Sequence, residues 1–373
     1  MSWKFKYYDI QNGPDWVGLE NNCDWFRDMK LVPQDKIWHA EGDVQIHTKM
    51  VCESLIGLPE FKLLTDLEKH IMFTSALMHD IEKRSTTTEE EKRGRICIVA
   101  PKHAERGEKT ARTILYKDFD CPYSVRELIC KIVKWHGKPL HSCSEKTMIN
   151  LATQVPLNLL AMIAKADILG RICEDAEENL EKIEFFTLLA EELECLNEPR
   201  EFESYLAEFT YLNSEDGYLE YSPFNETKFG VMMMSALPGS GKDTYIAKNL
   251  KDWGVVSLDD IRIELGVKPT DKSGNGRVIQ LAKERAKEFM RKKQNFVWNA
   301  TNITSQLRKQ LIDLFISYGG YVTIVYVEVP YKKLLKQNGD REAQVPSSVI
   351  DKMIGKLEPP VREEAHELVL FTI

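Results

Sequence analysis

The sequence lacks the spacings and runs that mark several classes of protein. Its eight cysteines lie far apart with no CxxC spacing, which argues against a disulfide framework and against a thiolate zinc cluster. No apolar run approaches the roughly 18 residues that a membrane span needs, and no N-terminal stretch joins a basic flank to an apolar core. Internal repeats and low-complexity tracts are also missing. We therefore expect a cytoplasmic globular protein with reduced thiols and no membrane partner.

At 373 residues the chain is long for a single hydrophobic core, so two domains are expected. The two parts of the chain differ in charge. Residues 1–229 carry 28 Lys and Arg against 41 Asp and Glu, whereas residues 230–373 carry 22 against 17. The basic excess of the second part is small, so it can hold a few phosphates but is no polybasic surface for nucleic acid.

Hydrophobic periodicity divides the chain into a helical part and an alternating part. The first part has apolar residues at helical spacing and no convincing strand before about residue 220. After a polar segment that contains Gly and Pro, short apolar runs alternate with helical ones, which is typical of a parallel sheet wrapped by helices. We predict a multi-domain protein with an all-α domain at 1–212, a linker at 213–228 and an α/β domain at 229–373. The expected helices of the first domain span 43–58, 65–80, 103–116, 122–135, 156–173 and 175–197.

The stretch ALPGSGKDT, residues 236–244, follows an apolar run and precedes a helical pattern, as a phosphate-binding loop does. Its glycines let backbone N–H groups turn toward phosphate oxygens, and its lysine reaches the β and γ phosphates. A glycine-rich turn that arose by chance would not need a strand before it and a helix after it. The expected nucleotide-binding residues are Pro238, Gly239, Ser240, Gly241, Lys242, Asp243 and Thr244.

Asp243 departs from the usual loop, because it stands where Ser or Thr normally contacts Mg²⁺. A carboxylate can hold Mg²⁺ directly or through water, but it also brings negative charge near the phosphates. The sequence leaves its role open.

Acidic residues follow one strand after the loop, in SLDDIR at 257–262. This placement suits the acceptor site of a kinase, where Asp259 would accept the proton of an attacking hydroxyl and Arg262 would hold an acceptor phosphate. The alternative is that Asp259 and Asp260 only cap the next helix.

PGSGKDT and SLDDIR, with NATN at 299–302 and NGDREAQVP at 338–346, resemble the kinase domain of 5′-OH polynucleotide kinases. The resemblance covers about residues 229–373. It implies that Asp259 is the general base, that Arg262 contacts the 3′-side phosphate of the acceptor, and that Arg341 in a lid clamps the nucleotide phosphates. Read without the resemblance, Arg341 is a solvated loop charge. The implied cofactors are Mg²⁺ and a nucleoside triphosphate, with ATP and GTP both open.

Seven of the eight histidines lie in the first half of the chain, and several of them form a series with aspartates. His47 falls in a helix, the pair His79 and Asp80 closes the next helix, and Asp167 lies in an apolar helical segment. An uncompensated carboxylate would be costly in such a segment. A shared divalent metal ion removes several of these penalties at once, because imidazole nitrogen and carboxylate oxygen suit a first-row ion.

The segments HAEGDVQIHT, HDIEK and KADILGR resemble the HD-domain phosphohydrolases, in which a histidine, a His–Asp pair and a distant aspartate bind one metal. HAEGDVQIHT is also similar to the HD domain fused to some tRNA nucleotidyltransferases. The resemblance implies that Mn²⁺, Ni²⁺, Co²⁺, Zn²⁺ or Fe²⁺ is bound by His47, His79, Asp80 and Asp167.

Other residues of these segments match further family positions. His103 and His136 match the extra histidines of members that hold two metals, although a histidine there can instead bind phosphate. His39 and Lys83 lie in the signature and are expected to orient neighbours or substrate.

The fusion of the two domains resembles bacterial enzymes of RNA end-healing and repair. One domain would remove 2′,3′-cyclic, 2′ or 3′ phosphates, and the other would phosphorylate 5′-OH ends. The expected partners are RNA or DNA ends, a nucleoside triphosphate donor and a separate RNA ligase. Two alternatives remain at this point: a nucleotide-hydrolysing HD domain joined to a small-molecule kinase, and a regulatory nucleotide switch.

Overall fold

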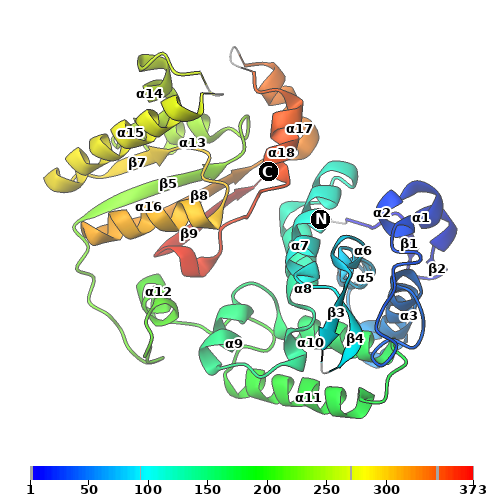
Figure 1. Cartoon of the computed structure of the whole chain (residues 1–373). Coiled ribbons are helices and arrows are strands. Elements are labelled where there is room, and N and C mark those ends of the chain that lie inside the picture. Colours follow the sequence, from blue (N-terminus) through cyan, green and yellow to red (C-terminus); the bar gives the residue numbers. More distant parts are fainter. Residues whose placement is uncertain (1–2, 93, 269–270, 342–343, 373) are drawn as a thin grey trace. The chain divides into compact units, whose positions relative to one another are not determined.

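The computed structural model of the chain describes residues 3–92, 94–268, 271–341 and 344–372, and it separates into two units (Figure 1). The division falls between Arg200 and Glu201, so residues 201–212 belong to the second unit and not to the first as the sequence predicted. The reason is helix α12 (Tyr205–Asn213), which binds the second unit. Within it, Glu208 pairs with Arg362 at 3.3 Å, and the ring of Phe209 lies 4.4 Å from that of His366.

The first unit is built mainly from helices, as its periodicity predicted. The central helices α3, α5, α8 and α10 pack on one another, and α7 and α11 pack on α8 and α10. The helices are α1 (Trp16–Asn22), α2 (Asp24–Arg27), α3 (Val44–Gly57), α4 (Pro59–Leu63), α5 (Asp66–Met78), α6 (Lys83–Thr86), α7 (His103–Asp118), α8 (Tyr123–Trp135), α9 (Glu145–Ala152), α10 (Leu157–Leu169) and α11 (Ala176–Glu192), with a 3₁₀ turn η1 (Lys138–Leu140).

Local sequence explains where the core helices begin and what they bury. Helix α5 starts at a capping box. The Thr65 hydroxyl accepts from the backbone N–H of Glu68, and the Glu68 carboxylate accepts from the backbone N–H of Thr65. Helix α10 is apolar almost throughout, and Asp167 is its one buried acid among the residues that the structure describes. Within the same described residues, no single helix is long and apolar enough to span a membrane. The bent pair α9 and α10 meets that test only when taken together, by length and composition.

Two small antiparallel hairpins interrupt the helices, and the prediction of no strand before residue 220 was wrong here. They are β1 (Tyr8–Asp9) with β2 (Gly13–Pro14), and β3 (Thr88–Lys92) with β4 (Arg95–Val99). Every residue of β3 is exposed, so the strand has no alternation of buried and exposed positions for the sequence to reveal.

A buried network of charges joins α7 to α8. The Glu127 carboxylate accepts hydrogen bonds from Arg112 Nε at 3.0 Å and from Arg126 Nε at 2.8 Å. Glu108 accepts from Arg112 Nη2 at 2.8 Å and from Lys131 Nζ at 3.0 Å. Both arginines are fully buried. Burial alone would raise the pKa of Glu127, but the two guanidinium groups hold that pKa below its ordinary value.

The second unit contains a five-stranded parallel sheet, which confirms the predicted α/β architecture. Its order is β6-β7-β5-β8-β9, with β5 in the centre, and every neighbouring pair is parallel. The carboxyl ends of β5, β6 and β7 therefore lie at one edge, where open α/β sheets bind ligands. The strands are β5 (Phe229–Ala236), β6 (Gly254–Ser257), β7 (Phe296–Asn299), β8 (Gly320–Glu328) and β9 (Glu367–Thr372).

Helices cover both faces of this sheet and bury its apolar side chains (Figure 1). One core forms around Met233, Trp298 and Phe315, and a second one forms around Met234, Val297 and Val325. The helices are α13 (Lys242–Asn249), α14 (Leu258–Glu264), α15 (Lys272–Lys292), α16 (Ser305–Ser317), α17 (Tyr331–Gly339) and α18 (Ser347–Ile354), with a 3₁₀ turn η2 (Arg362–Glu364).

The ion network predicts a large effect of Glu127→Ala on stability. The substitution leaves Arg112 and Arg126 buried without their shared carboxylate. We therefore expect the free energy of unfolding of the first unit to fall by about 3–5 kcal/mol. Thermal unfolding followed by circular dichroism measures this. Glu192→Ala, at an exposed position of α11, is the control and should change stability by less than about 0.5 kcal/mol. Equal melting temperatures for both variants would contradict the structural role of the network.

Candidate functional site

Four residues predicted as metal ligands come together in the first unit. His47 lies in the first turn of α3, His79 and Asp80 follow α5, and Asp167 lies near the end of α10. His47 Nε2 is 3.1 Å from Asp167 Oδ1 and 3.5 Å from Asp80 Oδ2. His79 Nε2 is 3.2 Å from Asp80 Oδ2 and 3.3 Å from His47 Nε2. All four side chains are buried, and His47, His79 and Asp80 each place one ligand atom within 4.8 Å of the others.

The two further histidines extend this cluster on the other side of Asp80. His103 Nε2 lies 3.3 Å and His136 Nε2 lies 3.9 Å from Asp80 Oδ1. Asp80 thus presents one oxygen to His47 and His79 and the other to His103 and His136. A carboxylate between two sets of nitrogen ligands could bridge a pair of metal ions.

Backbone hydrogen bonds fix the ring orientation of three histidines. His79, His103 and His136 each place Nδ1 at 2.7 to 2.8 Å from a carbonyl oxygen three residues earlier in the chain. A carbonyl only accepts, so Nδ1 of each ring carries a proton and Nε2 is the nitrogen that faces Asp80. Metal-binding histidines are held in this way.

Unsatisfied acceptors also fit a bound cation. Asp80 Oδ1 and His103 Nε2 are buried and, within the described residues, have no hydrogen-bond partner. Leaving buried polar atoms unpaired costs free energy, and a divalent ion held between them would remove that cost. The donor set of imidazoles and carboxylates suits a first-row ion.

Basic side chains keep the two aspartates ionised. Burial alone would raise the pKa of Asp80, but Lys83, with Nζ at 2.7 Å from Oδ2, and His79 hold it well below its ordinary value. Burial would likewise raise the pKa of Asp167, but Arg171 and His47 hold it well below its ordinary value. Arg171 Nε donates to Asp167 Oδ1 at 3.2 Å. Both carboxylates are therefore available as anionic ligands.

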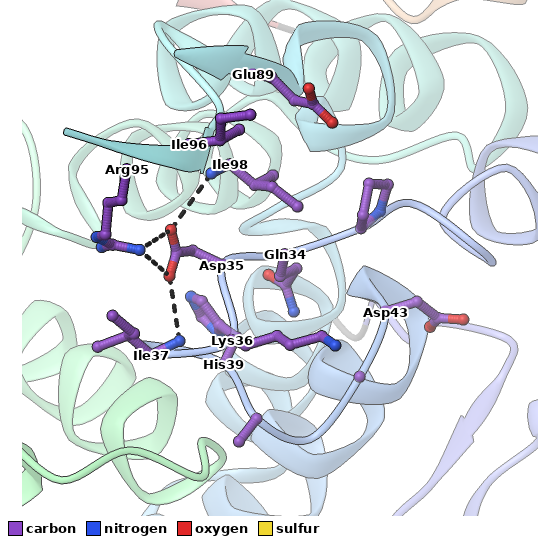
Figure 2. Close-up of a pocket in the computed structure, with 13 residues that line it drawn as sticks. Gln34, Asp35, Lys36, Ile37, His39, Asp43, Glu89, Arg95, Ile96 and Ile98 are labelled. Carbon is purple, nitrogen blue, oxygen red and sulfur yellow. Dashed lines mark hydrogen bonds and ion pairs between the residues drawn. The ribbon is translucent and has the colours of Figure 1, made fainter. Parts of the chain in front are cut away.

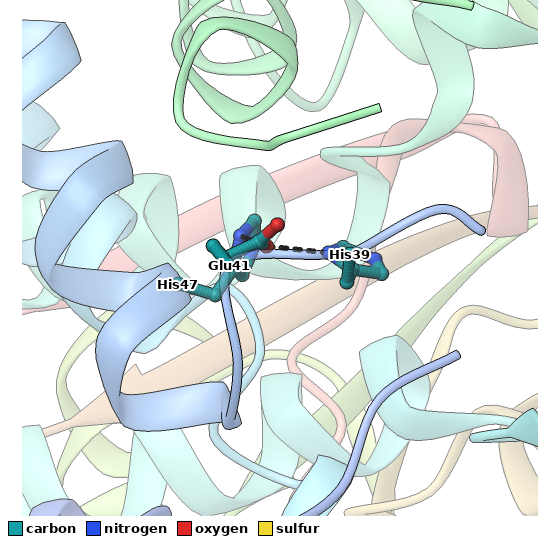
Figure 3. A group of neighbouring side chains, drawn as sticks. All are labelled: His39, Glu41 and His47. Carbon is teal, nitrogen blue, oxygen red and sulfur yellow. Dashed lines mark hydrogen bonds and ion pairs between the residues drawn. The ribbon is translucent and has the colours of Figure 1, made fainter. Parts of the chain in front are cut away.

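Glu41 lies between His47 and His39 (Figure 3). Its Oε1 lies 2.9 Å from Nδ1 of His47 and 2.9 Å from Nδ1 of His39, and its Oε2 accepts from the backbone N–H of Ile172 at 2.9 Å. Burial by itself would raise the pKa of Glu41, but the contacts with both histidines hold it below its ordinary value. The Glu41 carboxylate thus contacts both histidines.

Two of these supporting residues, Glu41 and Arg171, were missed by sequence reasoning. Arg171 stands four residues after Asp167, one helical turn away, which is a signal that could have found it. Glu41 lies in a loop before α3, where no periodicity relates it to His47.

The phosphate-binding loop lies between β5 and α13 in the second unit. Gly239 and Gly241 have φ values of 86° and 94°, a left-handed conformation that glycine adopts without strain. A Cβ on Gly239 would lie 3.3 Å from the Asn338 backbone and side chain, so the loop also packs closely on α17. Lys242 begins α13 and is buried.

The structure brings the predicted acceptor acid to this loop. Asp259, at the start of α14, places Oδ2 at 3.6 Å from Lys242 Nζ. Its Oδ1 accepts from Arg262 Nη1 at 2.5 Å, and Arg262 Nε donates to Asn275 Oδ1 at 3.2 Å. The Asp259 side chain is about half exposed at 56 %, so an incoming substrate can reach it. Asp260 differs, because its backbone N–H donates to the Ser257 hydroxyl that caps α14.

Asp243 is held in place by two donors. Its Oδ1 accepts from Lys242 Nζ at 2.9 Å and from Asn299 Nδ2 at 2.9 Å, at the end of β7. Burial would raise the pKa of Asp243, but these hydrogen bonds and the charges of Lys242 and Arg341 hold it below its ordinary value. Arg341 is half-buried, whereas residues 342 and 343 of its segment lie outside the described residues. Sequence reasoning quoted the NATN segment but missed this contact of Asn299.

Residues 231–360 match the family model AAA_33, described as an AAA domain. The second unit is therefore a P-loop, kinase-like domain, and such domains use Mg²⁺ with a nucleoside triphosphate. A candidate kinase from Chloroflexus aurantiacus J-10-fl, known from its crystal structure, is 12% identical with a TM-score of 0.34, over 39% of this chain and 86% of that one.

The cluster in the first unit predicts metal binding that depends on Asp80. The protein should bind Mn²⁺ in a calorimetric titration and should melt at a higher temperature with the metal, since a ligand at a hundred times its Kd adds about 2.7 kcal/mol. Asp80→Asn should lose both effects. His141→Ala, an exposed histidine outside the cluster, is the control and should keep them. Full metal-dependent stabilisation of Asp80→Asn would contradict the assignment.

Proposed function

We propose that the chain is a bifunctional enzyme that heals broken polynucleotide ends. In this proposal the second unit transfers a γ-phosphoryl group to a 5′-OH end. The first unit hydrolyses 2′,3′-cyclic, 2′ or 3′ phosphate ends. The observation that carries the proposal is the convergence of His47, His79, Asp80 and Asp167, in a chain that also holds a phosphate-binding loop with Asp259 beside its lysine.

The proposed kinase reaction follows from the charges around the loop. Backbone N–H groups and Lys242 hold the donor phosphates, and Arg341 adds positive charge on the side of Asp243. Asp259 accepts the proton of the attacking 5′ hydroxyl, while Arg262 holds the neighbouring phosphate of the acceptor strand. The fixed carboxylate of Asp243 is a hard oxygen ligand next to the site where Mg²⁺ accompanies the triphosphate.

The proposed phosphohydrolase site would be loaded with one or two of the ions Mn²⁺, Ni²⁺, Co²⁺, Zn²⁺ and Fe²⁺. A bound divalent ion there supplies a water of lowered pKa and stabilises negative charge on phosphorus. The ligands would be His47, His79, Asp80 and Asp167, with His103 and His136 as the second pair. Glu41 orients His47, and Lys83 and Arg171 supply positive charge beside the site.

The two activities complement each other chemically. Cleavage that leaves a 2′,3′-cyclic phosphate and a 5′-OH produces ends that a ligase cannot join. Removing the 2′,3′-cyclic phosphate and adding a phosphate to the 5′-OH gives ends that a ligase can join, so a separate RNA ligase is the proposed partner. We propose that the enzyme acts in the cytoplasm, on RNA or DNA ends.

Paired variants test the kinase assignment. Wild-type protein with Mg²⁺ and ATP or GTP should phosphorylate a 5′-OH oligonucleotide. Asp259→Asn should lower the rate by about 10²- to 10⁴-fold, because the general base is lost. Asp260→Asn is the matched control and should keep most of the rate, since its contact with Ser257 uses only the backbone. Full transfer by Asp259→Asn would refute the assignment.

A second pair of measurements tests the hydrolase and the independence of the two sites. Wild-type protein with Mn²⁺ should hydrolyse an oligonucleotide that ends in a 2′,3′-cyclic phosphate. Asp80→Asn should abolish this reaction and leave 5′ phosphorylation unchanged, because Asp80 lies in the other unit. Loss of both activities in either single variant would favour a regulatory nucleotide switch instead.

A further inference from the structure

A cavity of about 710 Å³ opens in the first unit, with Gln34 and His39 among the residues that line it (Figure 2). Its walls come from the loop 33–43 before α3 and from the hairpin of β3 and β4. The proposed phosphohydrolase chemistry does not use this cavity. Its size is that of cavities that bind small ligands, which span about 300–1,000 Å³.

Asp35 holds the two walls together. Its carboxylate accepts from the backbone N–H of Ile37 at 3.1 Å in its own loop and from Arg95 Nη1 at 3.1 Å and the backbone N–H of Ile98 at 3.3 Å in β4. Figure 2 shows these bonds spanning the loop and the strand. The cavity is therefore a built feature, fixed by a buried carboxylate.

Gln34 links the cavity to the cluster. Its Oε1 accepts from Lys83 Nζ at 2.9 Å, and the same Nζ lies 2.7 Å from Asp80 Oδ2. An ammonium group only donates, so the amide oxygen must face Lys83 and the amide nitrogen must point the other way. The side chain is 7% exposed and lines the cavity, and its Nε2 has no hydrogen-bond partner among the described residues.

A buried amide donor without a partner is costly unless a ligand supplies the acceptor. That acceptor would lie on the far side of the Gln34 amide from Lys83, which in turn contacts Asp80, beside which the proposed function places the phosphate of the substrate. His39 reaches the cluster from the same wall through Glu41 and His47.

We propose that Gln34 is a substrate-binding residue, whose Nε2 donates a hydrogen bond to an oxygen of the terminal phosphate, while the attached nucleoside lies in the cavity. The proposal rests on the proposed phosphohydrolase function. It identifies the loop 33–43 and the β3–β4 hairpin as the elements that recognise the nucleoside end of the strand.

Two substitutions distinguish the contribution of the Gln34 amide donor, Nε2, from that of its acceptor, Oε1. Gln34→Glu keeps an oxygen for Lys83 and removes the donor, whereas Gln34→Met removes both without adding charge. Each should lower kcat/KM for an oligonucleotide ending in a 2′,3′-cyclic phosphate by about tenfold to a hundredfold, as expected for a lost hydrogen bond to a charged group. Gln11→Glu, an exposed glutamine of the same unit, is the matched control and should leave kcat/KM unchanged.

Further readouts distinguish substrate binding from damage to the site. Both variants should bind Mn²⁺ as the wild type does and should phosphorylate 5′-OH ends at the wild-type rate. Wild-type kcat/KM in both variants would overturn the proposal. Loss of Mn²⁺ binding would also overturn it, because Gln34 would then act only through Lys83 and Asp80.

The cavity has its own test. Asp35→Asn loosens the hairpin, so it should weaken hydrolysis of the oligonucleotide far more than hydrolysis of p-nitrophenyl phosphate, which has no nucleoside. Equal losses on both substrates would overturn the role of the cavity. If wild-type protein hydrolyses p-nitrophenyl phosphate but no phosphate-ended oligonucleotide, the proposed function itself fails, and the role of Gln34 fails with it.

Discussion

The need to compensate buried charge governs the first unit. Asp80 and Asp167 are almost completely buried, and a carboxylate in such surroundings is costly unless cations and donors meet it. Lys83 and Arg171 supply part of that compensation, while the imidazoles of His47 and His79 approach the same oxygens. Helices α3, α5 and α10 must therefore pack in one arrangement, because a different packing would leave these charges unpaired.

The part of the second unit that the structure describes has a phosphate-binding loop instead of a cluster of histidines and aspartates. A parallel sheet brings the ends of β5, β6 and β7 to one edge, so the loop with Lys242, the acid Asp259 and the amide of Asn299 meet there although they are far apart in sequence. Backbone N–H groups and a buried lysine suit the triphosphate of a donor, whereas imidazoles and carboxylates suit a metal-dependent hydrolysis. In the proposed function, one chain combines two chemically distinct phosphate sites.

Periodicity and motif spacing predicted much of this arrangement, and the failures have physical causes. The helices around His47, His79 and Asp167 show regular apolar spacing, and the loop at 236–244 lies in the required strand–loop–helix setting. The β3–β4 hairpin was missed because β3 is exposed along its length. The boundary after Arg200 was missed because α12 reads as one more helix, and only its contacts with Arg362 and His366 assign it to the second unit.

Long-range contacts of loop residues were beyond sequence reasoning. Glu41 and Gln34 have no periodic relation to the ligands, and their roles depend on how the chain before α3 folds back on the cluster. Asp243 was recognised as unusual, but its partner Asn299 ends strand β7 and could be found only from the sheet order.

Anomalous X-ray diffraction from crystals grown with Mn²⁺ tests the central claim most directly. We expect an anomalous peak between His47, His79, Asp80 and Asp167, at roughly 2.0–2.3 Å from their ligating atoms. Well-ordered crystals that show Mn²⁺ at other positions, and no peak among these four side chains, would contradict the claim that they form a metal centre.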